Sequence, residues 1–257
     1  MYRPAAIVFL LMFATGLAWG QDLNHFRTIL ESDNTEAKRN VLLQIRELKS
    51  EEASRIATKA LSDKNEMIRA TGASSLLGLP PHEAVAVLAP LLKDRSPFVR
   101  TEAAYALGKV GDDSAVQPLV VVLQKDRAKE ARAAAAISLG KIGDLSAMDP
   151  LTDVFRKSPS EDNEFIRRSA ARSIGEIGEN IRTDGGDLIS FTAAIHVMIK
   201  ALNNSKETDD TRREAAYALG AIGDREALPA LSSHLNSPDY YLVDICKKAI
   251  AAIESGQ

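Results

Sequence analysis

The fold is decided by residues 99–112, which read VRTEAAYALGKVGD. The same pattern returns at residues 212–224 as RREAAYALGAIGD and, more loosely, at residues 135–144 and 170–179. A pattern that recurs at a nearly fixed spacing is the signature of a repeat protein, in which each copy forms one structural unit. The architecture therefore follows from the repeat and not from any single residue.

Each copy opens on a basic residue, here called the anchor, or on Val243 in the last copy. Successive anchors lie 31, 31, 32, 35, 45 and 31 residues apart. Aliphatic residues follow each anchor at seven and ten positions, as Leu76 and Leu79 do in the second copy, and this spacing places them on one stripe of a helix. The basic anchors are Lys38, Arg69, Arg100, Arg132, Arg167 and Arg212.

A second helix is predicted after each of these. Gly-Asp or a related pair follows the first helix, as at Gly111-Asp112. Gly ends a helix readily because it accepts positive φ, and Asp suits the start of the next helix, where it accepts from free backbone N–H groups. We name the helix that follows Gly-Asp helix A and the helix that contains the anchor helix B. Ser96-Pro97 and Ser237-Pro238 are predicted to start B helices.

The sequence predicts an all-α fold, a right-handed α-solenoid of about seven antiparallel helix pairs. This number includes a first A helix near residues 23–30. Stacking of neighbouring pairs buries the apolar stripes in one continuous core. Residues 21–257 are predicted to form a single solenoid, with an inserted loop at residues 179–192 that accounts for most of the 45-residue interval.

The repeated string A-A-x-A-L-G-x-I-G-D resembles HEAT-type repeats, in particular the short bacterial variety of the phycobilisome lyases. The resemblance extends over nearly all of the chain after residue 20. It implies an armadillo-type solenoid in which the B helices line a concave side that binds partners. The Thr-Pro-Leu-His signature of ankyrin repeats and the aromatic pattern of tetratricopeptide repeats are absent.

The N-terminus predicts a cleavable signal peptide over residues 1–20. One basic residue, Arg3, precedes an apolar run, and small residues precede the expected cleavage site after Gly20. An uncleaved membrane anchor is the alternative, although Gly16 interrupts the short run. No later segment is apolar enough to cross a membrane, so we expect a periplasmic or secreted protein without a transmembrane segment once the signal is removed.

Charge and cysteine content narrow the function further. The chain has 32 basic and 35 acidic residues, and removal of residues 1–20 takes away Arg3 alone, which leaves 31 against 35 and a net charge of −4. A mildly acidic protein has no general electrostatic affinity for nucleic acid, so we expect none as a partner. Cys246 is the single cysteine. It cannot form an internal disulfide, and we interpret it as a small packing residue.

Aspartates recur in the turn between helix A and helix B. Because they share the period of the basic anchors, we expect ion pairs between neighbouring repeats that stabilise the stack. The aspartates are Asp33, Asp63, Asp94, Asp126, Asp162 and Asp209.

The exposed face of the B helices is the candidate binding surface. Tyr and Arg side chains that the repeat does not need are common energetic anchors at protein interfaces. The alternative is an ordinary solvated helix face. The predicted partner-binding residues are Tyr105, Lys109, Lys141, Arg168, Arg172, Arg213 and Tyr217.

No catalytic, cofactor-binding or metal-binding group is predicted. The HEAT-type enzyme deoxyhypusine hydroxylase binds two irons through several His-Glu pairs on its repeats, whereas this chain has one such pair, His82-Glu83. Asp184 and Asp187 in the inserted segment lack the further ligands of a calcium loop, which favours a flexible turn.

The sequence therefore predicts an exported, non-enzymatic binding or scaffold protein, monomeric and without a cofactor. Its concave face would bind another protein or a peptide in the cell envelope. The alternatives are a HEAT-type enzyme or enzyme accessory, either lyase-like or a metal-dependent, hydroxylase-like oxidoreductase, and a binder of cell-wall polysaccharide. The missing His-Glu pairs disfavour the metal-dependent enzyme, and the few aromatic residues left after removal of Trp19 disfavour the polysaccharide binder.

Overall fold

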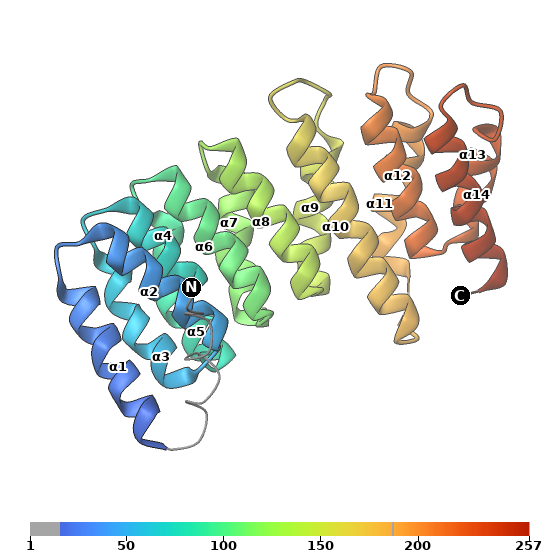
Figure 1. Cartoon of the computed structure of the whole chain (residues 1–257). Helices are drawn as coiled ribbons and strands as arrows, with labels where there is room; N and C mark the ends of the chain where they lie inside the picture. Colours follow the sequence, from blue (N-terminus) through green and yellow to red (C-terminus); the bar gives the residue numbers. More distant parts are fainter. Residues whose placement is uncertain (1–15, 187, 257) are drawn as a thin grey trace, which may run out of the picture. The chain divides into compact units, whose positions relative to one another are not determined.

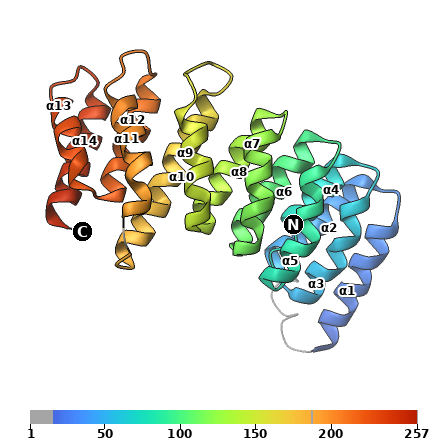
Figure 2. The ribbon, with the colours of Figure 1, turned by 180° about the vertical axis from the view of Figure 1, so that it is seen from behind.

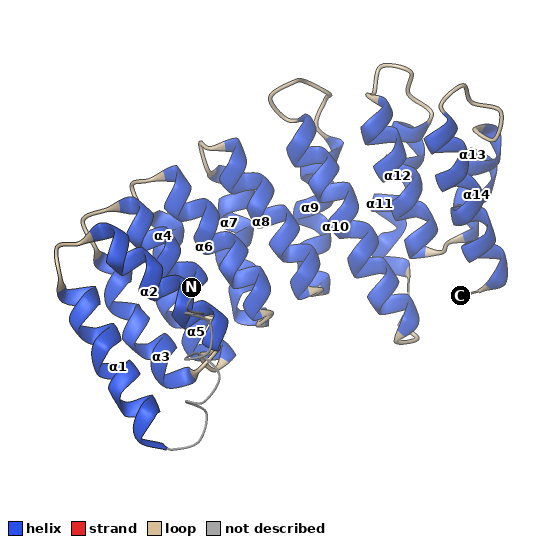
Figure 3. Ribbon diagram, viewed as in Figure 1, coloured by secondary structure: helices blue, strands red, loops and turns tan. Residues whose placement is uncertain are grey.

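The structure is a computed structural model that describes residues 16–186 and 188–256, and the side chains from Leu23 onward. Helices joined by short turns make up this part of the chain, and it contains no strand (Figure 3). They form seven A–B pairs, which confirms the all-α solenoid and its number of repeats. Residues 1–15, most of the predicted signal peptide, lie outside the described residues, and cleavage after Gly20 stays a prediction.

The chain divides into two compact units, residues 1–80 and 81–257, and each is described by itself. The prediction of a single continuous solenoid stays a prediction. The first unit holds two helix pairs, whose inner faces bury Phe26, Leu42 and Ile45. Its helices are α1 (Gly16–Glu31), α2 (Thr35–Leu48), α3 (Glu51–Ala57) with the 3₁₀ turn η1 (Thr58–Ser62), and α4 (Glu66–Ser74).

Helix α4 is shorter than the repeat predicts. It ends at Ser74, so Leu76 and Leu79 are buried as expected but lie beyond the helix. The segment that follows α4 is bounded by a proline pair and held by a serine side chain. The dipeptide Pro80-Pro81 cannot continue a helix and disfavours helical backbone before it. The side chain of Ser75 donates to the carbonyls of Leu42 and Thr71, at 2.8 and 2.7 Å.

The second unit stacks five helix pairs side by side, as the opposite views of Figures 1 and 2 show. Most of its A helices begin with a 3₁₀ turn. The A segments are α5 (Pro81–Leu88) with η2 (Ala89–Lys93), η3 (Asp113–Ala115) with α7 (Val116–Lys125), η4 (Leu145–Ala147) with α9 (Met148–Arg156), η5 (Ile189–Phe191) with α11 (Thr192–Leu202), and η6 (Arg225–Ala227) with α13 (Leu228–Ser233). The B helices are α6 (Pro97–Val110), α8 (Lys129–Ile142), α10 (Glu164–Thr183), α12 (Asp209–Ile222) and α14 (Tyr240–Ser255).

The Gly-Asp pairs act as predicted. Gly111, Gly143 and Gly223 adopt φ of 73°, 83° and 84°, and each donates its N–H to the carbonyl four residues earlier. The following Asp accepts from the backbone two residues on, as Asp112 does from Ser114 at 2.9 Å. The start predicted at Ser237-Pro238 is wrong, because the carboxylate of Asp239 caps α14 by accepting from two backbone N–H groups of its first turn.

Neighbouring B helices approach closely because the first glycine of the repeated string has no side chain. A Cβ at Gly108 would lie 2.5 Å from Cβ of Ser138, and a Cβ at Gly220 would lie 2.5 Å from Cβ of Ala249. The A helices touch one another much less. In a curved two-layer stack the tighter layer is the inner one, so within the second unit the B layer forms the concave side.

Serine side chains link successive B helices in three places. Ser138 donates to the carbonyl of Ala104 at 2.8 Å, and Ser173 donates to the carbonyl of Ala136 at 2.9 Å. Ser75 in the first unit makes the equivalent bond to Leu42. Each donor is buried, so these bonds satisfy hydroxyls that would otherwise lose their hydration without a partner.

The predicted ion pairs between repeats form at some anchors and not at others. Lys38 pairs with Asp63 at 2.7 Å, and Arg100 holds both carboxylate oxygens of Asp126 at 2.7 Å. Arg167 instead pairs with Glu207, and both side chains are almost fully buried.

The other two anchors of the second unit, Arg132 and Arg212, are held by backbone carbonyls. Arg132 donates Nε to the carbonyl of Leu123 at 2.9 Å, and Arg212 donates Nε to the carbonyl of Leu202 at 3.1 Å. Asp162 is exposed, and Asp209 lies 3.5 Å from Arg212 on the same helix. The ion pairs between repeats that were predicted for Asp162 and Asp209 are therefore wrong, because the added residues in these two intervals shift both aspartates away from the preceding anchor.

In the part of the chain that the structure describes, no helix has the length and apolar character needed to cross a membrane.

Candidate functional site

The candidate site lies on the concave side of the second unit, on the outer surface of its B helices, here called the B face. Corresponding positions on successive helices supply Tyr105, Ile137, Arg172, Tyr217 and Lys248. The side chains of Tyr105, Ile137 and Tyr217 are half-buried, whereas those of Arg172 and Lys248 are exposed. The B face is thus amphipathic.

Arg172 is held by two residues of the next B helix. Its guanidinium stacks 4.0 Å from the ring centre of Tyr217 and pairs with Glu214, with Nε 2.8 Å from one carboxylate oxygen. Burial opposes the charge on Arg172, but the hydrogen bond and charge of Glu214 outweigh it and raise the pKa of Arg172. Arg168, one turn earlier, pairs with Asp210 at 2.9 Å. Helix α10 is therefore fastened to α12 by two ion pairs and one cation–π contact.

Arg213 makes the corresponding link from α12 to α14. It donates Nε and Nη2 to the two oxygens of Asp239, both at 2.9 Å, and Nη1 to Asp210 at 2.8 Å. Its guanidinium also lies 5.2 Å from the ring centre of Tyr241. The hydrogen bond from Arg213 lowers the pKa of Asp239, and burial of the carboxylate opposes it. Arg213 thus stabilises the stack, and its role in binding a partner stays a prediction.

The other predicted residues lie farther along the B face. Tyr105 and Lys109 belong to α6, which is two B helices before α10. Lys141 belongs to α8, the B helix directly before α10. Both lysines are exposed, whereas burial, with a smaller effect from Glu102, raises the pKa of the Tyr105 phenol. The structure therefore brings together Arg168, Arg172, Arg213 and Tyr217, and it leaves Tyr105, Lys109 and Lys141 outside this cluster.

Glu176 is a half-buried carboxylate next to the cluster. Burial raises its pKa, the nearby charges of Arg172 and Lys141 lower it, and those of Glu214 and Glu179 raise it again. Burial prevails, because removal of a carboxylate from water disfavours its charged form. Glu176 therefore contributes unfavourably when it is ionised.

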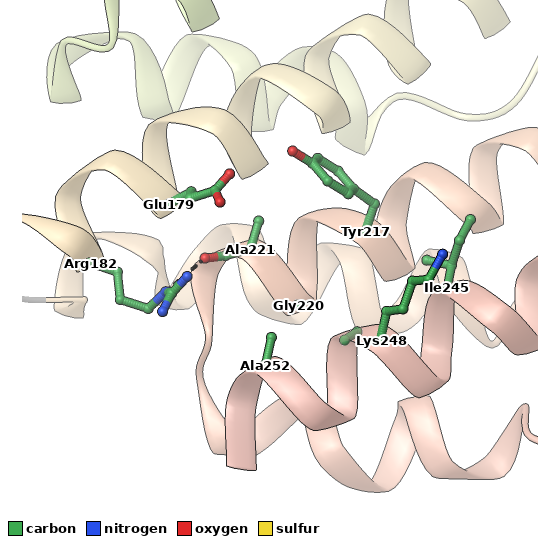
Figure 4. Close-up of a pocket in the computed structure, with 9 residues that line it drawn as sticks. Glu179, Arg182, Tyr217, Gly220, Ala221, Ile245, Lys248 and Ala252 are labelled. Carbon is green, nitrogen blue, oxygen red and sulfur yellow. Dashed lines mark hydrogen bonds between the residues drawn. The ribbon is translucent and has the colours of Figure 1, made fainter. Parts of the chain in front are cut away.

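A narrow slot of about 250 Å³ opens on the B face between α10, α12 and α14. Its floor is made of small residues, Gly220, Ala221, Ala249 and Ala252. Figure 4 shows Tyr217 pointing toward Glu179 across the opening, with Lys248 beyond Tyr217 on α14. Ile245 completes the apolar lining, so the slot combines an apolar interior with a charged rim.

The prediction of an inserted loop at residues 179–192 is largely wrong, because helices occupy both ends of this range. The added turn of α10 forms one wall of the slot. Helix α10 continues through Gly178 to Thr183, and η5 begins at Ile189. Gly178 stays helical because Ile181 continues the apolar stripe of the helix beyond it. Gly185, at φ 74°, ends the helix, and the N–H of Gly186 bonds to the carbonyl of Ile181 at 2.8 Å, as in a Schellman cap.

The added turn of α10 supplies two residues that the sequence analysis did not select. Glu179 reaches the rim of the slot, and Arg182 donates Nε to the carbonyl of Ala221 at 3.0 Å (Figure 4). This bond satisfies a carbonyl near the C-terminal end of α12 that the helix itself leaves free. The continued stripe at Ile181 is the sequence signal that would have found this turn.

Two other predictions concern reactive groups. Cys246 is fully buried on α14, and its burial raises the pKa of the thiol to about 11, as expected of a packing residue. The described residues hold no group of three or more His, Cys, Asp or Glu side chains placed to bind one metal ion. His82 and Glu83 lie in the first turn of α5, and Asp187 lies outside the described residues.

Known structures share the fold. Kap121p has a TM-score of 0.61 at 10% identity over 92% of this chain and 34% of that chain. The complex of CpcE and CpcF of phycocyanin lyase from Nostoc sp. PCC7120 has a TM-score of 0.52 at 19% identity over 91% of this chain and 94% of that one. Human deoxyhypusine hydroxylase in complex with glycerol has a TM-score of 0.46 at 20% identity, over 93% and 98%. At such low identities, the two similarities with TM-scores above 0.5 show the fold alone.

No curated protein matches the chain by sequence. The family model for HEAT repeats does match, at residues 73–140, 119–184 and 166–251. These segments overlap and extend over most of the chain, including the B helices of the second unit as far as residue 251. With the helix pairs, the capping glycines and the ion pairs between repeats already described, they show that the chain belongs to the HEAT-repeat family.

Proposed function

We propose that this chain is a non-enzymatic binding protein of the cell envelope, whose B face in residues 81–257 holds a segment of another protein. The slot between α10, α12 and α14 carries the proposal. An apolar interior ringed by polar groups is the usual form of a pocket that receives the anchoring side chain of a partner.

The dimensions of the slot favour a peptide segment that inserts one large apolar side chain. A volume of about 250 Å³ exceeds that of a single side chain, so the adjoining backbone would enter as well. Tyr217 and Ile245 would contact the inserted group, and Glu179 and Lys248 would contact the flanking polar atoms. Tyr217 is already oriented by Arg172, so little side-chain freedom is lost on binding.

Site-specific photocrosslinking in the producing cell tests this proposal. A photoreactive residue in place of Lys248, at the rim, should capture one defined partner. The same residue in place of Val121, which is 51% exposed on an A helix, is the matched control and should not capture it. Ala252→Phe should abolish capture at Lys248, because the new ring occupies the part of the slot where the partner's side chain would insert, without removing any polar contact. Equal capture at both positions, or capture unaffected by Ala252→Phe, would reject this site.

Two further measurements test the remaining parts of the proposal. A fusion of residues 1–20 to a reporter that is active only outside the cytoplasm should be active, and an inactive fusion would contradict export. Iron at one or more equivalents in the purified protein would contradict a non-enzymatic role, since HEAT-type hydroxylases require it.

A further inference from the structure

A second cavity, of about 430 Å³, lies at the opposite edge of the second unit, where helices A turn into helices B. The end of α9, the loop that follows it, α11 and the loop before α12 form its walls. Five of its lining residues are basic types and one is acidic, in a chain whose net charge is −3. They are Arg156, Lys157, Arg167, His196, Lys200 and Glu207.

The one acidic residue is fully occupied by one of the basic ones. Glu207 binds Arg167 through both carboxylate oxygens, at 2.7 and 2.5 Å, with side chains 4% and 3% exposed. Arg167 is further held by the carbonyl of Phe155, to which Nε donates at 3.0 Å. The buried pair is neutral as a unit, so it neither attracts nor repels a ligand strongly.

The exposed cations therefore set the charge of the cavity. Arg156 has one ion pair among the described residues, an exposed contact to Asp153 at 3.1 Å that is worth little in water. Lys157 and Lys200 are exposed, and no carboxylate of the described residues forms an ion pair with either. His196 contacts Glu226 at 2.8 Å on the surface. Three cations thus surround a concave space that lacks a matching anion.

The cavity owes its existence to a departure from the repeat. The anchor interval that contains α9 is 35 residues long, against 31 at the regular repeats. The additional residues lengthen the loop at 157–163, and Lys157, Ser158 and Pro159 from this loop form one wall. The loop is shaped by Asn163, whose amide donates to the carbonyl of Ser158 at 2.8 Å. Val197 and Pro159 supply apolar surface beside the cations.

We propose that this cavity binds a small organic dianion, with its charged group on Arg156, Lys157 and Lys200 and its carbon skeleton against Pro159 and Val197. Charge-assisted hydrogen bonds from Arg and Lys suit phosphate monoesters and dicarboxylates alike. The site is separate from the B face and does not depend on the function proposed for it.

Titration calorimetry of the full chain with glycerol 3-phosphate, succinate and inorganic phosphate tests the proposal. We expect saturable binding of glycerol 3-phosphate or succinate, tighter than that of inorganic phosphate because only the organic ligands contact Pro159 and Val197. Preference between the first two probes distinguishes a phosphate ester from a dicarboxylate. Lys157→Gln with Lys200→Gln should weaken binding at least about tenfold.

The matched control is Lys93→Gln with Lys247→Gln, which removes the same charge from two exposed lysines that line neither the cavity nor the slot. It should change the affinity less than about twofold, since those lysines are screened from the cavity at moderate salt. Equal weakening by both pairs of substitutions would show general attraction to positive charge and overturn the proposal. So would the absence of saturable binding by all three probes.

Discussion

Gly108 illustrates how single residues determine the stack. It lies within α6, where Ala would favour the helix by about 1 kcal/mol. In Gly108→Ala, however, the new Cβ would lie 2.7 Å from Cα of Ser138, an atom that can move only if α8 moves. We expect a net loss of stability, because such over-packing costs about 1–3 kcal/mol. Urea denaturation measures it, with Lys109→Ala as the exposed neighbouring control. Unchanged or increased stability of Gly108→Ala would contradict the close approach of α6 and α8.

The raised pKa of Glu176 predicts that the stability of the protein depends on pH. Its folded pKa lies above its ordinary value of 4.5, so its contribution to stability is fully present below that value and is lost as pH rises through the folded pKa. Glu176→Gln should therefore match the natural protein at acid pH and exceed its stability at neutral pH. Denaturation curves at a series of pH values test this, with the exposed Glu130→Gln as a control for the loss of one charge. A natural protein that is more stable than Glu176→Gln at neutral pH would show that Arg172 and Lys141 outweigh burial.

At the scale of elements, the pair Arg167–Glu207 joins α10 to the loop before α12. Glu207→Gln leaves a buried guanidinium without its counter-charge, so we expect a loss of about 3–5 kcal/mol. Arg167→Met with Glu207→Leu removes both charges and should recover most of it. A double-mutant cycle by chemical denaturation measures the coupling. Asp153→Asn, which breaks the exposed pair with Arg156, should change stability by no more than about 1 kcal/mol. A double variant as unstable as Glu207→Gln would contradict this account.

The elements show how far the sequence could be interpreted. Helix pairs, capping glycines and the buried stripe follow from local spacing, so they were predictable. The end of α10 was not, because Gly178 occupies the capping position of Gly111 and Gly143 yet is followed by helix-compatible residues. The ion-pair partners of the arginines on the B face were also not predictable, since Arg172 and Glu214 are 42 residues apart and meet only when two repeats stack. The local residue pattern predicts each helix pair. Contacts between repeats can be predicted only when the alignment of one repeat against the next is also known.

At the scale of the whole molecule, the two candidate sites coincide with the two irregular intervals. The 35-residue interval supplies the loop wall of the basic cavity. The 45-residue interval supplies the opposite wall of that cavity and the added turn of α10 that walls the slot. Regular repeats bury their recurring charged residues in the stack, where Arg100 and Asp126 form an ion pair. Surface that differs from one repeat to the next is therefore where specific binding can develop in this protein, and the interval lengths identify it.

Stacking also implies that stability varies along the molecule. The pair of α13 and α14 has only one neighbouring repeat, so it should open before the central repeats. Cys246 reports this directly, because its thiol is buried and its pKa is raised to about 11, which leaves it inert until α14 detaches. We expect its alkylation to accelerate at urea concentrations below those at which most helical circular dichroism is lost.

A second cysteine position provides the internal comparison. In Cys246→Ala with Ala131→Cys, the thiol is buried in α8, which has neighbours on both sides. Its alkylation should follow the main loss of helix, because opening there must break two interfaces between repeats instead of one. If the thiols at 246 and 131 became reactive at the same urea concentration, the described repeats would unfold as one cooperative body. The terminal pair would then be as stable as the centre, and nearest-neighbour stacking would not govern the stability of this chain.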